Sequence, residues 1–110
     1  MKELIDIVWN NRDLLKEKKY SDAVKSTLEK LNKGEIKVAE KIDSKWIVNE
    51  WVKKAVILFF PLMEMKTIEL GPFEFHDKIK LKTNYRKQVV RVVTHANARY
   101  VSFINKCVVL

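Results

Sequence analysis

Residues 89–110 read VVRVVTHANARYVSFINKCVVL, a stretch dense in β-branched side chains and without a helical period. Apolar residues recur in it every six positions, at Val92, Ala98, Ile104 and Leu110, with Phe103 and Val109 as a neighbouring pair at the same interval. Hexapeptide periodicity is typical of a parallel β-helix, in which six residues form one side of a triangular coil and the apolar position points inward. Because such a coil needs about three or more stacked repeats, we expect this β-helix to be incomplete here.

The segment before this coil predicts short extended structure rather than helix. Gly71-Pro72 predicts a turn, and Phe73 and Phe75 alternate with polar residues after it. Ile79 and Leu81 then alternate with lysines.

Apolar spacing predicts two amphipathic helices at the start of the chain. The first covers residues 4–15 and is ended by the lysine-rich segment 16–19. The second begins with Ser21 at the N-cap and closes at Gly34, a glycine placed just beyond the C-terminus.

After Gly34, apolar residues alternate with polar ones at a period of two. This alternation predicts a β-hairpin over residues 36–48, with its turn at 43–45. Glu40 falls on the apolar side of the first strand. A carboxylate in that register is expected at a sheet edge or paired with a lysine.

A third helix is predicted between Asn49, which can cap it, and Pro61, which ends it. Trp51, Ala55 and Leu58 share one face of this helix. It is the best candidate for the core of the domain.

Composition favours one small folded domain. The 110 residues are 47% hydrophobic and 33% charged, which excludes a disordered tail, a collagen-like repeat and a disulfide-rich mini-protein. The single Cys107 and the lack of a leader pattern favour the cytoplasm. The longest apolar run, 55–60, stops at Pro61 and is far too short to cross a membrane.

A formal net charge of +8 makes a polyanionic partner worth testing. However, the lysines are scattered through every segment, and aromatic residues at stacking spacing do not alternate with them. The charge therefore favours a solvated lysine-rich surface over a nucleic-acid interface.

Few residues have the spacing that catalysis or metal binding requires. His76, His95 and Cys107 lack any metal-ligand spacing, and with two glycines the chain has no phosphate-binding loop. We predict no catalytic, cofactor-binding or metal-binding residue among these 110. Arg91 is the exception as a substrate ligand, because a strand arginine among valines suits bidentate binding of a carboxylate. An ordinary exposed strand arginine is the other interpretation.

Two segments, LNKGEIKVAEKID at 31–43 and EWVKKAVIL at 50–58, with Trp46 between them, resemble the N-terminal domain of tetrahydrodipicolinate N-succinyltransferases. HDKI at 76–79 resembles the family's F-D-K-V segment. VRVV at 90–93, followed by Ala98-Arg99 and Phe103-Ile104, resembles the family's entry into its left-handed β-helix. The resemblance covers essentially the whole chain.

The resemblance implies an α+β fold, with an N-terminal domain over residues 1–88 and the first coil of a left-handed parallel β-helix over 89–110. It implies a trimer that transfers succinyl from succinyl-CoA, its co-substrate, to the amino group of L-2-amino-6-oxopimelate in diaminopimelate and lysine biosynthesis. No bound cofactor is implied. Arg91 matches the family arginine that binds the acceptor, whereas the family's acidic catalytic residues lie in later coils, so we expect this chain alone to be inactive.

Departures from the family pattern follow the Arg91 strand. Thr94-His95 replace two prolines, and Val101 stands where a glycine is usual. A β-branched residue does not easily take positive φ, so an altered corner is expected there. Two alternatives to the truncated enzyme stay open: a free-standing basic module for an anionic partner, and one half of a split succinyltransferase.

Overall fold

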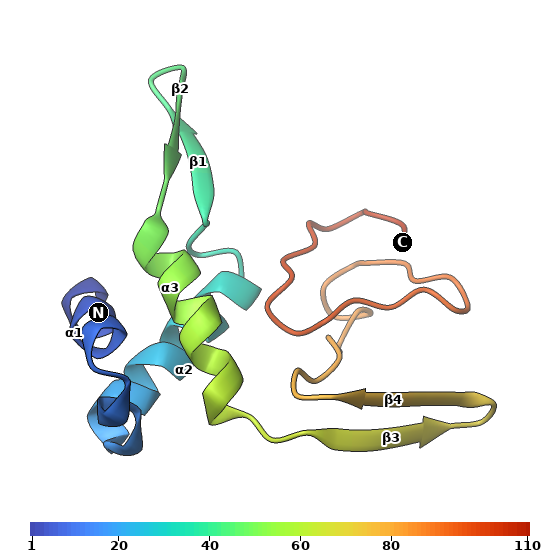
Figure 1. Ribbon diagram of the computed structural model, residues 1–110. Helices are drawn as coiled ribbons and strands as arrows, with labels where there is room; N and C mark the ends of the chain where they lie inside the picture. Colours follow the sequence, from blue (N-terminus) through green and yellow to red (C-terminus); the bar gives the residue numbers. More distant parts are fainter. The chain divides into compact units, whose positions relative to one another are not determined.

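The computed structural model describes residues 1–110 and has an α+β fold of three α-helices and two β-hairpins (Figure 1). By their contacts the residues form two units, Met1–Leu62 and Met63–Leu110. The regular elements are α1 (Lys2–Asn10), a 3-10 turn (Arg12–Lys16), α2 (Lys18–Asn32), β1 (Ala39–Ile42), β2 (Lys45–Val48), α3 (Glu50–Phe59), a second 3-10 turn (Phe60–Leu62), β3 (Lys66–Leu70) and β4 (Phe73–Asp77). The predicted α+β class is confirmed.

The core of the first unit lies among α1, α2 and α3. Its fully buried apolar side chains come from all three helices and are Ile5, Val8, Val24, Leu28, Val52, Ala55 and Leu58. The prediction that the third helix supplies the core is confirmed, but the buried stripe includes Val52 while Trp51 is half-buried. None of the helices has the length and apolarity that a bilayer crossing requires.

The helix ends differ from the predicted ones in two places. The backbone at Asn11 is extended, with φ −142° and ψ 89°, so the expected first helix is a helix followed by a 3-10 turn that buries Leu15. The second helix begins at Lys18, and Ser21 lies inside it, where its hydroxyl donates to the carbonyl of Lys18 at 3.1 Å. Gly34 ends this helix at φ 74°, as predicted.

Short polar contacts tie the helices together. Lys54 of α3 forms an ion pair with Asp6 of α1 at 2.9 Å, and its ammonium lies 6.0 Å from the centroid of the Trp9 ring.

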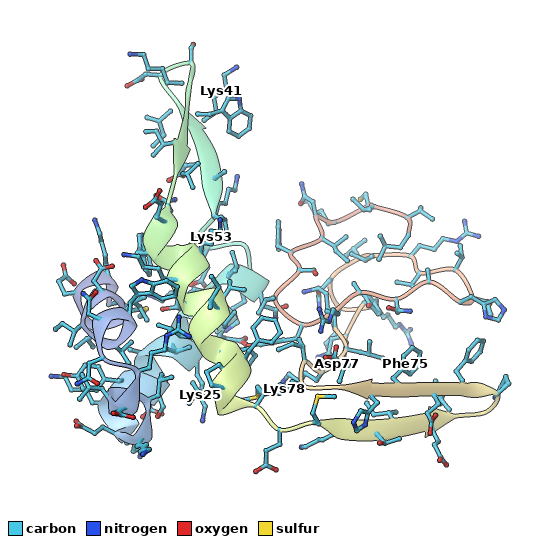
Figure 2. All side chains as sticks on the ribbon, viewed as in Figure 1. Lys25, Lys41, Lys53, Phe75, Asp77 and Lys78 are labelled. Atoms are coloured by element: carbon cyan, nitrogen blue, oxygen red, sulfur yellow. The ribbon has the colours of Figure 1, made fainter.

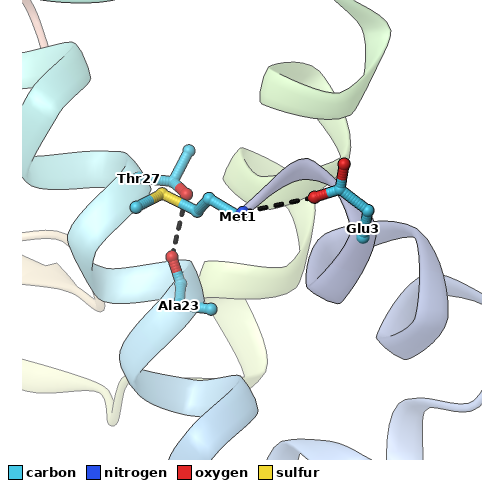
Figure 3. A network of polar contacts seen from close by, with 4 residues as sticks. All are labelled: Met1, Glu3, Ala23 and Thr27. Atoms are coloured by element: carbon cyan, nitrogen blue, oxygen red, sulfur yellow. Dashed lines mark hydrogen bonds and ion pairs between the residues drawn. The ribbon is translucent and has the colours of Figure 1, made fainter.

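Within α2 the buried hydroxyl of Thr27 donates to the carbonyl of Ala23 at 2.8 Å (Figure 3). Burial of this polar group therefore leaves no unmet hydrogen bond.

At the start of α1 the terminal ammonium of Met1 lies 3.4 Å from the carboxylate of Glu3 (Figure 3). The backbone N–H of Glu3 and this ammonium together lower the pKa of the Glu3 carboxyl. A negative charge in the first turn also interacts favourably with the helix dipole and so stabilises α1.

Strands β1 and β2 form the predicted hairpin, although pairing starts at Ala39 rather than at residue 36. Asp43 and Ser44 both have positive φ, as a two-residue hairpin turn requires. Glu40 is half-buried, and its partner is not a lysine: Asn49 donates to it at 3.2 Å. Asn49 precedes α3 as expected, but its side chain makes no capping bond. Its amide nitrogen instead donates to the carbonyl of Lys37 at the base of the hairpin, at 2.8 Å.

Strands β3 and β4 form a second antiparallel hairpin, with Gly71 in the turn at φ 58°. The predicted turn and the strand after it are confirmed. The register pairs Ile68 with Phe75 and Leu70 with Phe73 on one face. On the other face the hydroxyl of Thr67 lies 2.7 Å from Nδ1 of His76.

Residues 89–110 curve back on themselves so that Arg91 pairs in parallel with Val109, 18 residues later. This separation equals three of the predicted six-residue repeats. Positive φ also recurs every six residues, at Val89, His95, Val101 and Cys107. The four predicted inward positions (Val92, Ala98, Ile104 and Leu110) are half-buried, and the residue before each of them is exposed.

The corner at Val101 keeps a left-handed backbone, with φ 80°. A β-branched residue therefore does adopt positive φ at this corner, and valine is strained in it. For an L residue with a Cβ the left-handed region costs about 1–2 kcal/mol.

We expect Val101→Gly to strengthen the closure of residues 89–110, because glycine adopts positive φ without that cost. A net gain of about 1 kcal/mol should slow hydrogen exchange of the Cys107 and Leu110 amides, which donate to Val89 and Arg91, about fivefold. The control is Val92→Gly, a position without positive φ, which should speed exchange. Equal effects of the two substitutions would show that Val101 is not strained.

Candidate substrate-binding site around Arg91

Arg91 lies in a backbone segment that is held by hydrogen bonds on both sides. Its N–H donates to the carbonyl of Val108 at 3.0 Å, and its own carbonyl accepts from Leu110 at 2.8 Å. Its cross-strand neighbour in the parallel pair is Val109. The Cα position of Arg91 is thus fixed by residues that are distant in sequence.

The guanidinium of Arg91 is exposed and has no ion pair or hydrogen bond within the chain. The residue stands at the outward position next to inward Val92. Three exposed valines surround it in sequence or in register: Val89, Val93 and Val109. An unpaired guanidinium beside apolar side chains can present its planar fork to a carboxylate and partly exclude water from the contact.

Arg99 differs from Arg91 because it already has a carboxylate. It forms an ion pair with Asp77 at the end of β4. Figure 2 labels Asp77 and its neighbour Lys78 at this end of the strand. The backbone N–H of Lys78, which donates to Asp77 at 2.8 Å, and the guanidinium of Arg99 lower the pKa of the Asp77 carboxyl. Leu81 also pairs antiparallel with Arg99, so this arginine joins the end of the hairpin to the coil.

The remaining candidates from the sequence stay apart from each other. His76 bonds to Thr67 within the hairpin, and His95 packs edge-on against Phe73 with ring centroids 5.2 Å apart. Cys107 is exposed at a corner of the coil. No group of three or more His, Cys, Asp or Glu side chains is placed to hold a metal ion.

The structure adds Val109 to the site, which sequence reasoning missed. Val109 is exposed and pairs in parallel with Arg91. Tripling the six-residue interval from Arg91 would have found this neighbour. Lys106 lies farther away, level with Gln88, because it precedes the corner at Cys107, whose N–H donates to the carbonyl of Val89 at 2.7 Å.

Comparison with known proteins gives a consistent result. A family profile described as "Tetrahydrodipicolinate N-succinyltransferase N-terminal" matches residues 1–62, more than half of the chain. Enzymes named 2,3,4,5-tetrahydropyridine-2,6-dicarboxylate N-succinyltransferase are similar over almost all of it. The enzyme of Pseudoalteromonas translucida is 38% identical over 100% of this chain and 44% of its own length.

Two further relatives with the same name are similar to the same degree. The enzyme of Burkholderia ambifaria is 41% identical over 100% of this chain and 44% of its own length. The enzyme of Bordetella pertussis is 40% identical over 96% of this chain and 42% of its own length. The chain thus spans less than half the length of these relatives, matching their N-terminal portion. The alternative of a free-standing basic module for an anionic partner is not favoured, and the chain belongs to the tetrahydrodipicolinate N-succinyltransferase family.

Proposed function

We propose that this chain is the N-terminal part of an enzyme that transfers a succinyl group from succinyl-CoA to the acyclic form of tetrahydrodipicolinate, L-2-amino-6-oxopimelate. This is a step of diaminopimelate and lysine biosynthesis. The observation that carries the proposal is the similarity of about 40% over the whole chain to enzymes named for this reaction.

Within that enzyme, residues 1–88 serve as the N-terminal domain and residues 89–110 as the first coil of a left-handed parallel β-helix. Parallel pairing at an 18-residue separation and positive φ every six residues support the coil. The coil offers its outward positions to ligands and its inward positions to the core.

Arg91 binds a carboxylate of the acceptor. The support is its outward position, its lack of an internal partner and its three exposed valine neighbours. Arg99 differs because it is already paired with Asp77. A bidentate guanidinium contact would orient the acceptor so that its amino group faces the succinyl thioester. We assign no catalytic residue to 1–110, because the acidic groups for proton transfer are expected in later coils.

The assembly that completes the site is a homotrimer in the cytoplasm, with active sites between neighbouring β-helices. Succinyl-CoA is a co-substrate rather than a resident cofactor. The support for this arrangement is the resemblance of the chain to that family.

The test is a chimera in which residues 1–110 replace the matching segment of the Pseudoalteromonas translucida relative, which aligns with the whole chain. We expect the chimera to release free CoA thiol when given succinyl-CoA and the acceptor. The 110-residue chain alone should release none above the blank, since it spans 44% of that relative. A folded chimera that stays inactive while the parent enzyme turns over would contradict the proposal.

A further inference from the structure

The outer edge of strand β2 has no partner within the chain. Strands β1 and β2 form a hairpin that extends away from the three helices (Figure 1), and every residue of β2 is exposed. Trp46 is 72% exposed, although tryptophan side chains are largely buried in most proteins. An exposed apolar strand edge is a template for pairing with another strand.

The register of the hairpin determines which backbone groups of β2 point outward. With a two-residue turn, the residues that flank the turn exchange both N–H···O bonds, and such pairs alternate along the strands. The bond of 2.7 Å from the N–H of Asn49 to the carbonyl of Val38 fits this alternation. The N–H and C=O groups of Trp46 and Val48 therefore face away from β1, and they form no hydrogen bond within the chain.

The two edges of this hairpin are not equally protected. The outward backbone groups of β1 belong to Ala39 and Lys41. Charged residues at an edge, lysine above all, discourage pairing with another chain. Residues 46–48 of β2 contain no charge, no proline and no bulge. Pairing is therefore expected at β2 rather than at β1.

We propose that β2 pairs antiparallel with β2 of a second copy of this chain, about a two-fold axis at Ile47. In that register Trp46 exchanges both backbone bonds with Val48 of the second copy, and Val48 does the same with the second Trp46. All the outward groups of the two strands are then bonded. Each tryptophan side chain lies opposite a valine, and the two Ile47 side chains lie opposite each other.

The charges near this edge fit the same register. Lys45 comes opposite Asn49 of the second copy, one residue from Glu50 in the first turn of α3. An axis at Lys45 would instead place two lysines opposite each other, which destabilises a sheet. The contact is independent of the proposed transferase function. Because it is two-fold, in the proposed trimer it joins subunits of different trimers.

Sedimentation equilibrium of the full 110-residue chain, from about 10 μM to 1 mM, tests the proposal. We expect a dimer with a Kd on the order of 0.1 mM, as suits an interface of this small size. Added salt should strengthen the dimer, because it screens the repulsion between two chains that each have a net charge of +8. A chain that stays monomeric up to about 1 mM would overturn the proposal.

Val48→Pro and Val48→Ala separate backbone pairing from side-chain contact. Proline removes the outward N–H, which the hairpin does not use, and edge strands tolerate it. We expect Val48→Pro to weaken dimerisation at least about tenfold and Val48→Ala less than about fivefold. Amide NMR spectra check that the hairpin is intact in both variants. If Val48→Pro dimerises as well as Val48→Ala, the strands do not pair and the inference is wrong.

Ile47→Lys and Ile42→Lys form a second matched pair. The two isoleucines are 43% and 45% exposed and share one face of the hairpin, but Ile42 belongs to β1. Ile47→Lys places two ammonium groups opposite each other at the axis and should weaken dimerisation at least about tenfold. Ile42→Lys should leave the Kd within about threefold. Equal losses in the two variants would mean that association uses the apolar face in general, and would contradict pairing at β2.

Discussion

Replacing Arg91 with lysine in the chimera is expected to lower kcat/KM for the acceptor by about ten- to a hundredfold. Lysine keeps the positive charge but loses the planar fork, and loss of a charged hydrogen bond to a ligand costs about 1.5–3 kcal/mol. Steady-state kinetics with the acceptor varied at saturating succinyl-CoA measures the effect. The KM for succinyl-CoA should stay nearly constant, since Arg91 contacts the other substrate.

Arg99→Lys is the matched control, because Arg99 is engaged by Asp77 rather than by a ligand. Its acceptor kinetics should remain within about twofold of the unsubstituted chimera, the small change expected when an exposed ion pair keeps its charge. Identical kinetics for Arg91→Lys and the unsubstituted chimera would show that Arg91 is only a surface residue of the coil. The family membership would be unaffected by that result.

Replacing Leu58 with alanine is expected to lower the free energy of unfolding of the helical unit by about 2–5 kcal/mol. Leu58 is 0% exposed at the contact of α3 with the other two helices, so the substitution leaves a cavity as well as removing apolar burial. Urea denaturation followed by far-ultraviolet circular dichroism measures the change, because the helices belong to this unit.

The adjacent Ile57 supplies the control on the same helix. It is 38% exposed, and Ile57→Ala should cost less than about 1 kcal/mol. Similar losses for the two variants would mean that the packing of α3 is not as described.

Local chemistry made much of the fold predictable from the sequence. The spacing of apolar residues identified the third helix, and Gly34 marked the end of the second one because its left-handed φ of 74° suits glycine. The turn at Asp43-Ser44 was readable because both residues tolerate a left-handed backbone better than branched ones do.

The wrong predictions concern residues whose conformation depends on contacts with residues distant in the sequence. Asn49 was expected to cap α3, but its amide instead bonds to the carbonyl of Lys37 and to Glu40 at the base of the hairpin. The break at Asn11 was not predictable from spacing, because Leu15 keeps the helical period and reaches the core through a 3-10 turn. Strand β3 was missed because it has few apolar residues and depends on pairing with β4.

The candidate site was likewise predictable in part from the sequence and in part only from the structure. The run of valines around Arg91 was enough to single it out, but the distinction from Arg99 required the position of Asp77, which lies 22 residues away. The contact of Arg91 with Val109 depends on closure of the coil, which joins residues 18 positions apart.

The fixed separation between Arg91 and Val109 also limits which insertions and deletions this segment can accept. Adding one residue within a side of the coil would exchange the inward Ile104 for the outward Phe103 and move every later side chain to the opposite surface. A loop inserted at a corner, such as the one at Val101, would project outward and leave the pairing of Arg91 with Val109 in register. Length variation among homologues should therefore concentrate at the left-handed corners, and the number of residues on each side between them should stay constant.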